Sequence, residues 1–149
     1  MSVEYYAACR SALPPREGGW SLDVGPVAIS TMDLDDDVGR EVLELVPGTV
    51  ALVNFSSRAA GAEIGEGLSR LVARRLGGAL VYEDGPEVLE TFEVPAAAAC
   101  DARALEAEMR AWLADARGRE EEQLARAKAE WAAKTAADPK PKDDDWSDV

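Results

Sequence analysis

The chain has 149 residues, 47% of them hydrophobic and 30% charged, which suits one folded domain with an appendage and excludes disorder throughout. Its 29 acidic and 16 basic residues give a net charge of −13. A surplus of that sign repels phosphate backbones and anionic lipid surfaces, so binding to nucleic acid or to a membrane is not expected.

The residue types of common catalytic centres are missing from the predicted domain. The sequence has no histidine and every lysine follows residue 127, so no usual general base is present to activate a serine or a cysteine. Cys9 and Cys100 lie in apolar surroundings, which predicts buried thiols, although one disulfide remains possible. Residues 1–8 lack the features of a secretory signal. We expect a cytoplasmic protein that is not an enzyme and that holds no cofactor and no metal.

The first part of the chain predicts two strands and a helix. Residues 2–9 and 22–31 are rich in β-branched or aromatic side chains, and Gly25-Pro26 inside the second run indicates a bulge or an edge. The apolar spacing over residues 38–46 predicts a helix that follows a run of acidic residues.

The middle of the chain predicts a strand–helix–strand unit. Residues 49–55 are apolar at nearly every position, as in a strand that is buried on both faces. A helical stripe over 64–76 ends at two glycines, and a short strand follows at 79–82. This connection is long enough for a crossover between parallel neighbours. A further strand is expected at 88–94.

A long helix is predicted after Asp101, a plausible N-cap, and its apolar stripe is interrupted at Gly118. We therefore expect a domain at 1–117, a charged helical extension at 118–137 and a disordered acidic tail at 138–149. The predicted fold class is α/β or α+β, with a mixed sheet of four to five strands, two packed helices and a long C-terminal helix.

One acidic run has part of the spacing of a calcium-binding loop. A calcium loop needs glycine at its sixth position for the sharp turn, and Val38 stands there instead. The alternative, which we favour, is that the aspartates cap and charge the start of a helix. The residues concerned are Asp33, Asp35, Asp37, Glu41 and Glu44.

A second candidate site follows the buried strand that ends at Phe55. A strand, glycines and a helix start are the usual parts of a phosphate-binding turn. The glycines are not spaced as in the known phosphate loops, and Glu63 and Glu66 would repel a phosphate. A small-ligand site, if the chain has one, is expected at Ser56, Ser57, Arg58 and Gly61.

Exposed carboxylates and isolated tryptophans predict a surface that binds another protein. Negative charge speeds encounter with a basic partner, and aromatic side chains are enriched among interface anchors. Trp131 packing back on the domain is an equal alternative for that residue. The predicted partner-binding residues are Asp33, Asp35, Asp36, Asp37, Glu120, Glu121, Glu122, Trp131 and Trp146.

The stretch 49–82 ends in Arg-Arg-Leu-Gly-Gly-Ala-Leu-Val-Tyr. With this unit, its small size and its acidity, the chain resembles in organisation the bacterial immunity proteins, which neutralise a cognate toxin by covering its active site. The resemblance implies a non-catalytic binding protein whose partner is a basic toxin. Two alternatives stay open: a small-ligand-binding domain or enzyme that uses the turn after Phe55, and a helical adaptor in a secretion or phage assembly. The oligomeric state is also open.

Overall fold

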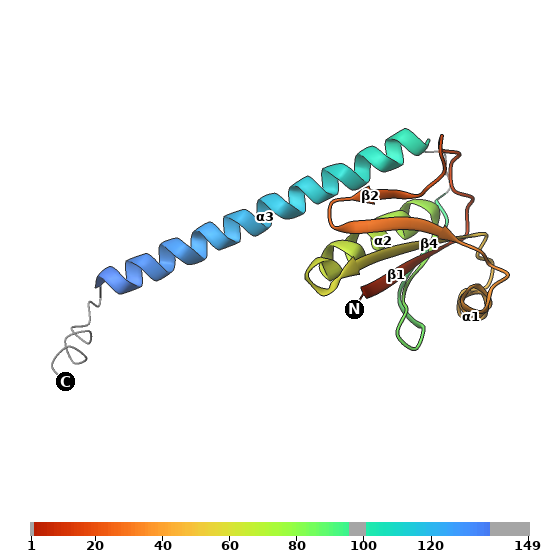
Figure 1. Cartoon of the computed structure of the whole chain (residues 1–149), viewed down its shortest axis with the longest axis horizontal. Coiled ribbons are helices and arrows are strands. Elements are labelled where there is room, and N and C mark those ends of the chain that lie inside the picture. The colour runs from red at the N-terminus through yellow and green to blue at the C-terminus, as the bar shows by residue number, and fades with distance from the viewer. Residues whose placement is uncertain (1, 96–100, 138–149) are drawn as a thin grey trace. The chain divides into compact units, whose positions relative to one another are not determined.

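The computed structural model describes residues 2–95 and 101–137, and the chain divides into two compact units after Ala114. The first unit is an α+β domain, and the second is the remaining part of the last helix (Figure 1). The strands are β1 (Ser2–Cys9), β2 (Leu22–Val24), β3 (Val27–Met32), β4 (Ala51–Arg58), β5 (Gly78–Tyr82) and β6 (Glu87–Phe92). The helices are α1 (Asp37–Leu45), the 3₁₀ turn η1 (Ala59–Gly61), α2 (Ala62–Leu76) and α3 (Ala102–Ala137).

The strands form one sheet of six in the order β2-β3-β4-β1-β5-β6. The α+β class and the long C-terminal helix are confirmed. The sheet differs from the expected mixed sheet of four to five strands, because all five adjacent pairs are antiparallel.

The strand–helix–strand unit also differs from the prediction in one respect. β4 and β5 both run antiparallel to β1, so they are parallel to each other, but β1 lies between them and they are not neighbours. The physical reason lies in β1, whose residues Tyr6 to Cys9 are all buried. A strand that is apolar on both faces belongs in the centre of a sheet, and helix α2 is long enough to cross over it.

Gly25 and Pro26 form a turn and not a bulge. Val24 pairs with Val27 across a two-residue connection, so the predicted strand at 22–31 is a hairpin of two strands. Gly25 has φ +58°, a positive value at the first central position as type II′ turns require, and the fixed negative φ of proline suits the second position. This hairpin accounts for the sixth strand, since the other four predicted strands each appear once.

The two faces of the sheet carry separate hydrophobic clusters. Side chains alternate along β1, so Ala7 and Cys9 join one cluster while Tyr6 and Ala8 join the other. The first cluster lies under α2 and the part of α3 within the first unit, with Phe55, Leu68, Val72, Leu105 and Met109 among its buried members. The second cluster lies under α1, with Val42, Val46, Leu52, Ala79 and Val81 among its buried members.

Aspartates cap two of the helices as the sequence suggests. The Oδ1 of Asp36 accepts a hydrogen bond from the backbone N–H of Gly39 at 2.7 Å, and the Oδ1 of Asp101 accepts one from Ala104 at 2.7 Å. Each bond satisfies an amide that has no partner within its own helix. Helix α3 is continuous through Gly118, so the glycine interrupts the apolar stripe and not the helix.

The second unit, taken by itself, is a helix without a buried face. Every described side chain from Arg117 to Ala136 is exposed, and the exposed fractions of Leu124 and Trp131 are 58% and 70%. No helix within residues 2–95 and 101–137 is long and apolar enough to cross a membrane.

Candidate functional site

Two carboxyl groups meet on the sheet face that α1 covers in part. Glu4 lies on β1, and Glu83 follows β5, the strand next to it. The two side chains share a hydrogen bond, which raises the pKa of Glu83 to about 7 and lowers the pKa of Glu4. Burial and the negative charges of Glu4 and Asp84 raise the pKa of Glu83 further. The pair therefore holds a proton near neutral pH, as closely placed carboxylates do.

The side chain of Asn54 holds the carboxylate of Glu4 in place. The Nδ2 of Asn54 on β4 donates a hydrogen bond to the Oε1 of Glu4 at 2.9 Å. The Oδ1 of Asn54 is buried and has no hydrogen-bond partner. Glu4 lies on a central strand of the sheet, and Glu83 lies in the turn that joins β5 to β6.

More carboxylates surround the ring of Tyr6, which is 4% exposed. Burial raises the pKa of Tyr6 to about 12, and the negative charges of Glu4, Glu83, Asp36 and Glu41 raise it in the same direction. These four acids come from β1, from the turn after β5, from the N-cap of α1 and from α1 itself. They lie close enough together to act on one phenol.

Helix α1 extends this negative surface outward. Asp37, Glu41 and Glu44 are spaced i, i+4 and i+7, so they share one side of the helix, and all three are exposed. Leu45 follows them and is 44% exposed. We name the following six residues the acidic face: Glu4, Asp36, Asp37, Glu41, Glu44 and Glu83.

The ion pairs of the domain all lie away from the acidic face. Among the described residues they join side chains of α2, α3, β6 and the loop before β2, and none includes an acid of the acidic face. Arginines pair with carboxylates on the α2 and α3 side, whereas the acids of the acidic face have no ion pair among the described residues, although the exposed Arg40 lies next to Glu41 on α1. Such a surface favours Lys and Arg side chains.

The predicted run of aspartates at 33–37 has mixed roles. The Oδ1 of Asp33 accepts a hydrogen bond from the backbone N–H of Asp35 at 2.9 Å, and Asp36 caps α1. Asp35 and Asp37 are exposed. Helix α1 starts at Asp37, so this run of aspartates lies at the start of a helix, which is the interpretation that we preferred to a calcium-binding loop. Among the residues described, no group of three or more acids or cysteines is arranged to hold a metal ion.

Sequence reasoning missed Glu4 and Glu83. One signal was present in the sequence: Glu4 shares a strand face with Tyr6 and Ala8, so a carboxyl group lies on a face that is otherwise apolar. The role of Glu83 depends on the pairing of β1 with β5, which local patterns do not reveal.

The residues after Phe55 do not converge on one site. β4 continues to Arg58, so Ser56 and Arg58 lie on one face of the sheet and Ser57 on the other. Ser57 is buried, and its Oγ has no hydrogen-bond partner. A Cβ atom added at Gly61 would meet Pro26 and Ser57 at 3.2 Å, so side chains already fill the space beside this glycine.

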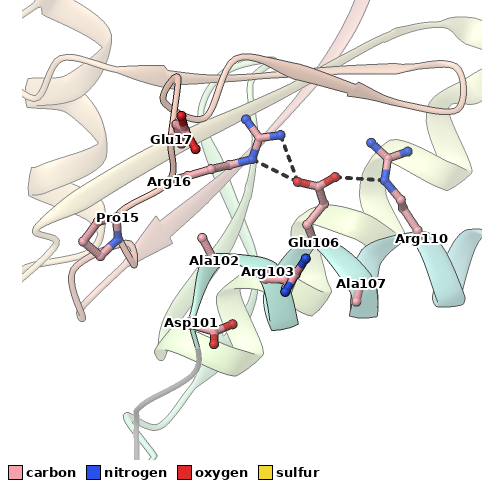
Figure 2. Close-up of a pocket in the computed structure, with 9 residues that line it drawn as sticks. All are labelled: Pro15, Arg16, Glu17, Asp101, Ala102, Arg103, Glu106, Ala107 and Arg110. Carbon is pink, nitrogen blue, oxygen red and sulfur yellow. Dashed lines mark hydrogen bonds and ion pairs between the residues drawn. The ribbon is translucent and has the colours of Figure 1, made fainter.

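A cavity of about 600 Å³ lies between the loop before β2 and the first turns of α3 (Figure 2). Glu106 lies at its centre and binds Arg16 through Oε1 at 2.9 Å and Arg110 through Oε2 at 3.1 Å (Figure 2). Arg16 also donates to the carbonyl of Gly19 at 2.8 Å and lies over the Trp20 ring. These contacts tie the loop to α3, so we interpret this cluster as structural.

The cysteines and the C-terminal candidates are placed as follows. Cys9 is a free, buried thiol whose pKa burial raises to about 12, which makes it unreactive. Glu120, Glu121, Glu122 and Trp131 are exposed and belong to the second unit, not to the acidic face. Cys100, Trp146 and the predicted tail at 138–149 lie outside the described residues.

Comparisons of the chain with protein-family models, with curated proteins and with solved structures found no match.

Proposed function

We propose that this chain is a non-catalytic binding protein that neutralises a basic bacterial toxin through the acidic face, in the manner of an immunity protein. The observation that carries the proposal is the separation of charge across the sheet. Four arginines (Arg16, Arg70, Arg75 and Arg110) pair with acids on the α2 and α3 side, while the six acids of the acidic face have no ion pair among the described residues.

The acidic face combines two properties of a site that binds basic proteins. Its charge attracts a positively charged surface over several ångströms and increases the association rate. Leu45 is 44% exposed beside the acids of α1 and offers an apolar contact whose burial slows dissociation. Both properties belong to ordered elements of the first unit.

The Glu4–Glu83 pair makes partner binding depend on pH. A lysine or arginine placed beside the pair favours its fully ionised form, because opposite charge lowers the pKa of a carboxyl. Partner binding at pH 6 to 7 therefore releases a proton, and affinity increases as the pH rises through the pKa of Glu83, about 7. Calorimetry in buffers of different ionisation enthalpy measures this release.

The function is tested by co-expression with the product of the neighbouring gene. We expect this product to be toxic alone and harmless when the present chain is co-expressed. Rescue that persists after the two proteins are shown not to form a complex would exclude neutralisation by binding, and a harmless neighbour would remove the basis for an immunity role.

The acidic face is tested with a matched pair of double variants. Glu4→Gln/Glu83→Gln is expected to weaken the complex at least about tenfold, because it removes two carboxylates from the site. Glu17→Gln/Glu63→Gln also removes two carboxyl groups, from exposed positions on the loop before β2 and on α2, and it is expected to bind as the wild type does. Equal weakening by both variants would show that net charge, and not the acidic face, attracts the partner.

A further inference from the structure

One side of the exposed helix in the second unit carries two large apolar side chains. Leu124 and Trp131 are two turns apart on the same side, and they are 58% and 70% exposed. Apolar side chains of this size are costly to leave in water, and tryptophan is a frequent interface anchor.

The charges on this side are segregated along the helix. Glu120 and Glu121 flank Leu124 on its N-terminal side, and Lys128 and Lys134 flank Trp131. None of these four charges belongs to an ion pair within the part of the chain that the structure describes. We name these six residues the α3 stripe: Glu120, Glu121, Leu124, Lys128, Trp131 and Lys134.

We infer that the α3 stripe binds the same stripe of a second copy of this chain, with the two helices antiparallel. Charge complementarity selects both the occupant and its direction. An antiparallel copy that crosses between Ala127 and Lys128 places the glutamates of each chain near Lys134 of the other and Leu124 opposite Trp131. A parallel copy would place glutamates beside glutamates and lysines beside lysines, which is repulsive.

This pairing goes beyond the proposed function and does not depend on it. The helix from Asp115 to Ala137 is about 35 Å long at about 1.5 Å per residue, so the paired surface is narrow. A narrow contact with one tryptophan per chain gives a weak, concentration-dependent dimer and not an obligate one.

The first test measures the mass of the full chain by sedimentation at increasing concentration. The wild type is expected to move from the monomer mass of 15.9 kDa toward twice that value. Trp131→Ala is expected to raise the dissociation constant at least about tenfold. Arg126→Ala lies on the opposite side of the helix and serves as the matched control, with little change expected. A monomeric wild type up to about 1 mM, or equal weakening by both variants, would overturn the inference.

The second test determines direction. In the variant E120K/E121K/K128E/K134E every charge of the α3 stripe is reversed, so antiparallel copies remain complementary to each other but repel the wild type. We expect the variant to dimerise with itself and not to mix with wild-type chains, as measured by native mass spectrometry on chains of different isotopic mass. Preferential formation of mixed dimers would contradict antiparallel pairing, because only parallel helices match the reversed charges with the original ones.

Discussion

Glu83 is a single residue whose ionisation links the fold to pH. Its carboxyl shares a hydrogen bond with Glu4, and its pKa is raised to about 7, whereas an unperturbed glutamate ionises near 4.5. A raised pKa means that the folded state favours the protonated form. The free energy of unfolding therefore falls as the pH rises from about 4.5 to about 7 and levels off above that range. The lowered pKa of Glu4 acts in the opposite sense, but at lower pH.

The Glu83→Gln variant is expected to remove this pH dependence. A neutral amide retains a hydrogen bond to Glu4 without the second charge, so the variant should be more stable than the wild type at pH 8 and similar to it at pH 5. Urea unfolding midpoints measured from pH 5 to pH 8 check this. Glu63→Gln is the control and should follow the wild-type curve. A wild-type midpoint that stays constant over this range would contradict the shared proton.

At the scale of elements, one close contact in the domain joins two helices. A Cβ atom added at Gly67 on α2 would overlap the indole of Trp112 on α3. Gly67 is buried, and Trp112 packs against the larger hydrophobic cluster. The glycine therefore allows α2 and the first turns of α3 to cover the sheet side by side.

Gly67→Ala is expected to destabilise the domain by about 1 to 3 kcal/mol, because the added methyl group displaces the indole from a packed position. Gly118→Ala is the matched control, since a Cβ atom there meets nothing within 4 Å. That substitution should raise the helix content measured by circular dichroism, as alanine is the better helix former. A Gly67→Ala variant with an unchanged urea midpoint would indicate that Trp112 moves aside without cost.

Element types followed from local sequence, whereas strand order did not. The strand at 2–9 and the helix at 38–46 were predicted to within one residue, because apolar spacing and capping residues act over a few positions. The centre of the sheet depends on β1 meeting strands that lie roughly 40 and 70 positions later in the chain. The hairpin at Gly25-Pro26 was missed because a two-residue turn resembles an interruption in one longer strand.

The candidate site, like the strand order, could be predicted only in part from local sequence. The acids of α1 were visible as a run, so Asp36 and Asp37 were predicted as partner contacts from their charge alone. Glu4 and Glu83 are far apart in sequence and meet only because β1 pairs with β5. Their shared proton is a property of tertiary structure, and no local pattern contains it.

On the scale of the whole molecule, stability is concentrated in the first unit. The buried hydrophobic residues of the described chain all lie at or before Leu113, and the second unit begins at Asp115. A chain that ends at Ala114 therefore keeps the whole described core. The charged helix beyond it adds no buried side chain to the described core.

A chain truncated after Ala114 should unfold within about 0.5 kcal/mol of the full chain, because it loses only exposed side chains. A chain truncated after Ala107 is the control. It lacks Met109 and Leu113 and should lose at least about 2 kcal/mol, in line with the removal of buried apolar side chains. Urea unfolding followed by tryptophan fluorescence compares the three chains. A large loss on truncation after Ala114 would show that the second unit supports the domain.

The central position of β1 has a consequence for protein synthesis. The ribosome releases this strand before either of its neighbours, β4 and β5, so the nascent strand has no partner while the hairpin and α1 emerge. Translation that began instead at the internal Met32 would yield a product without β1, β2 and nearly all of β3. In that product β4 would have no neighbouring strand and only β5 and β6 would stay paired, so we expect it to be degraded and not to accumulate.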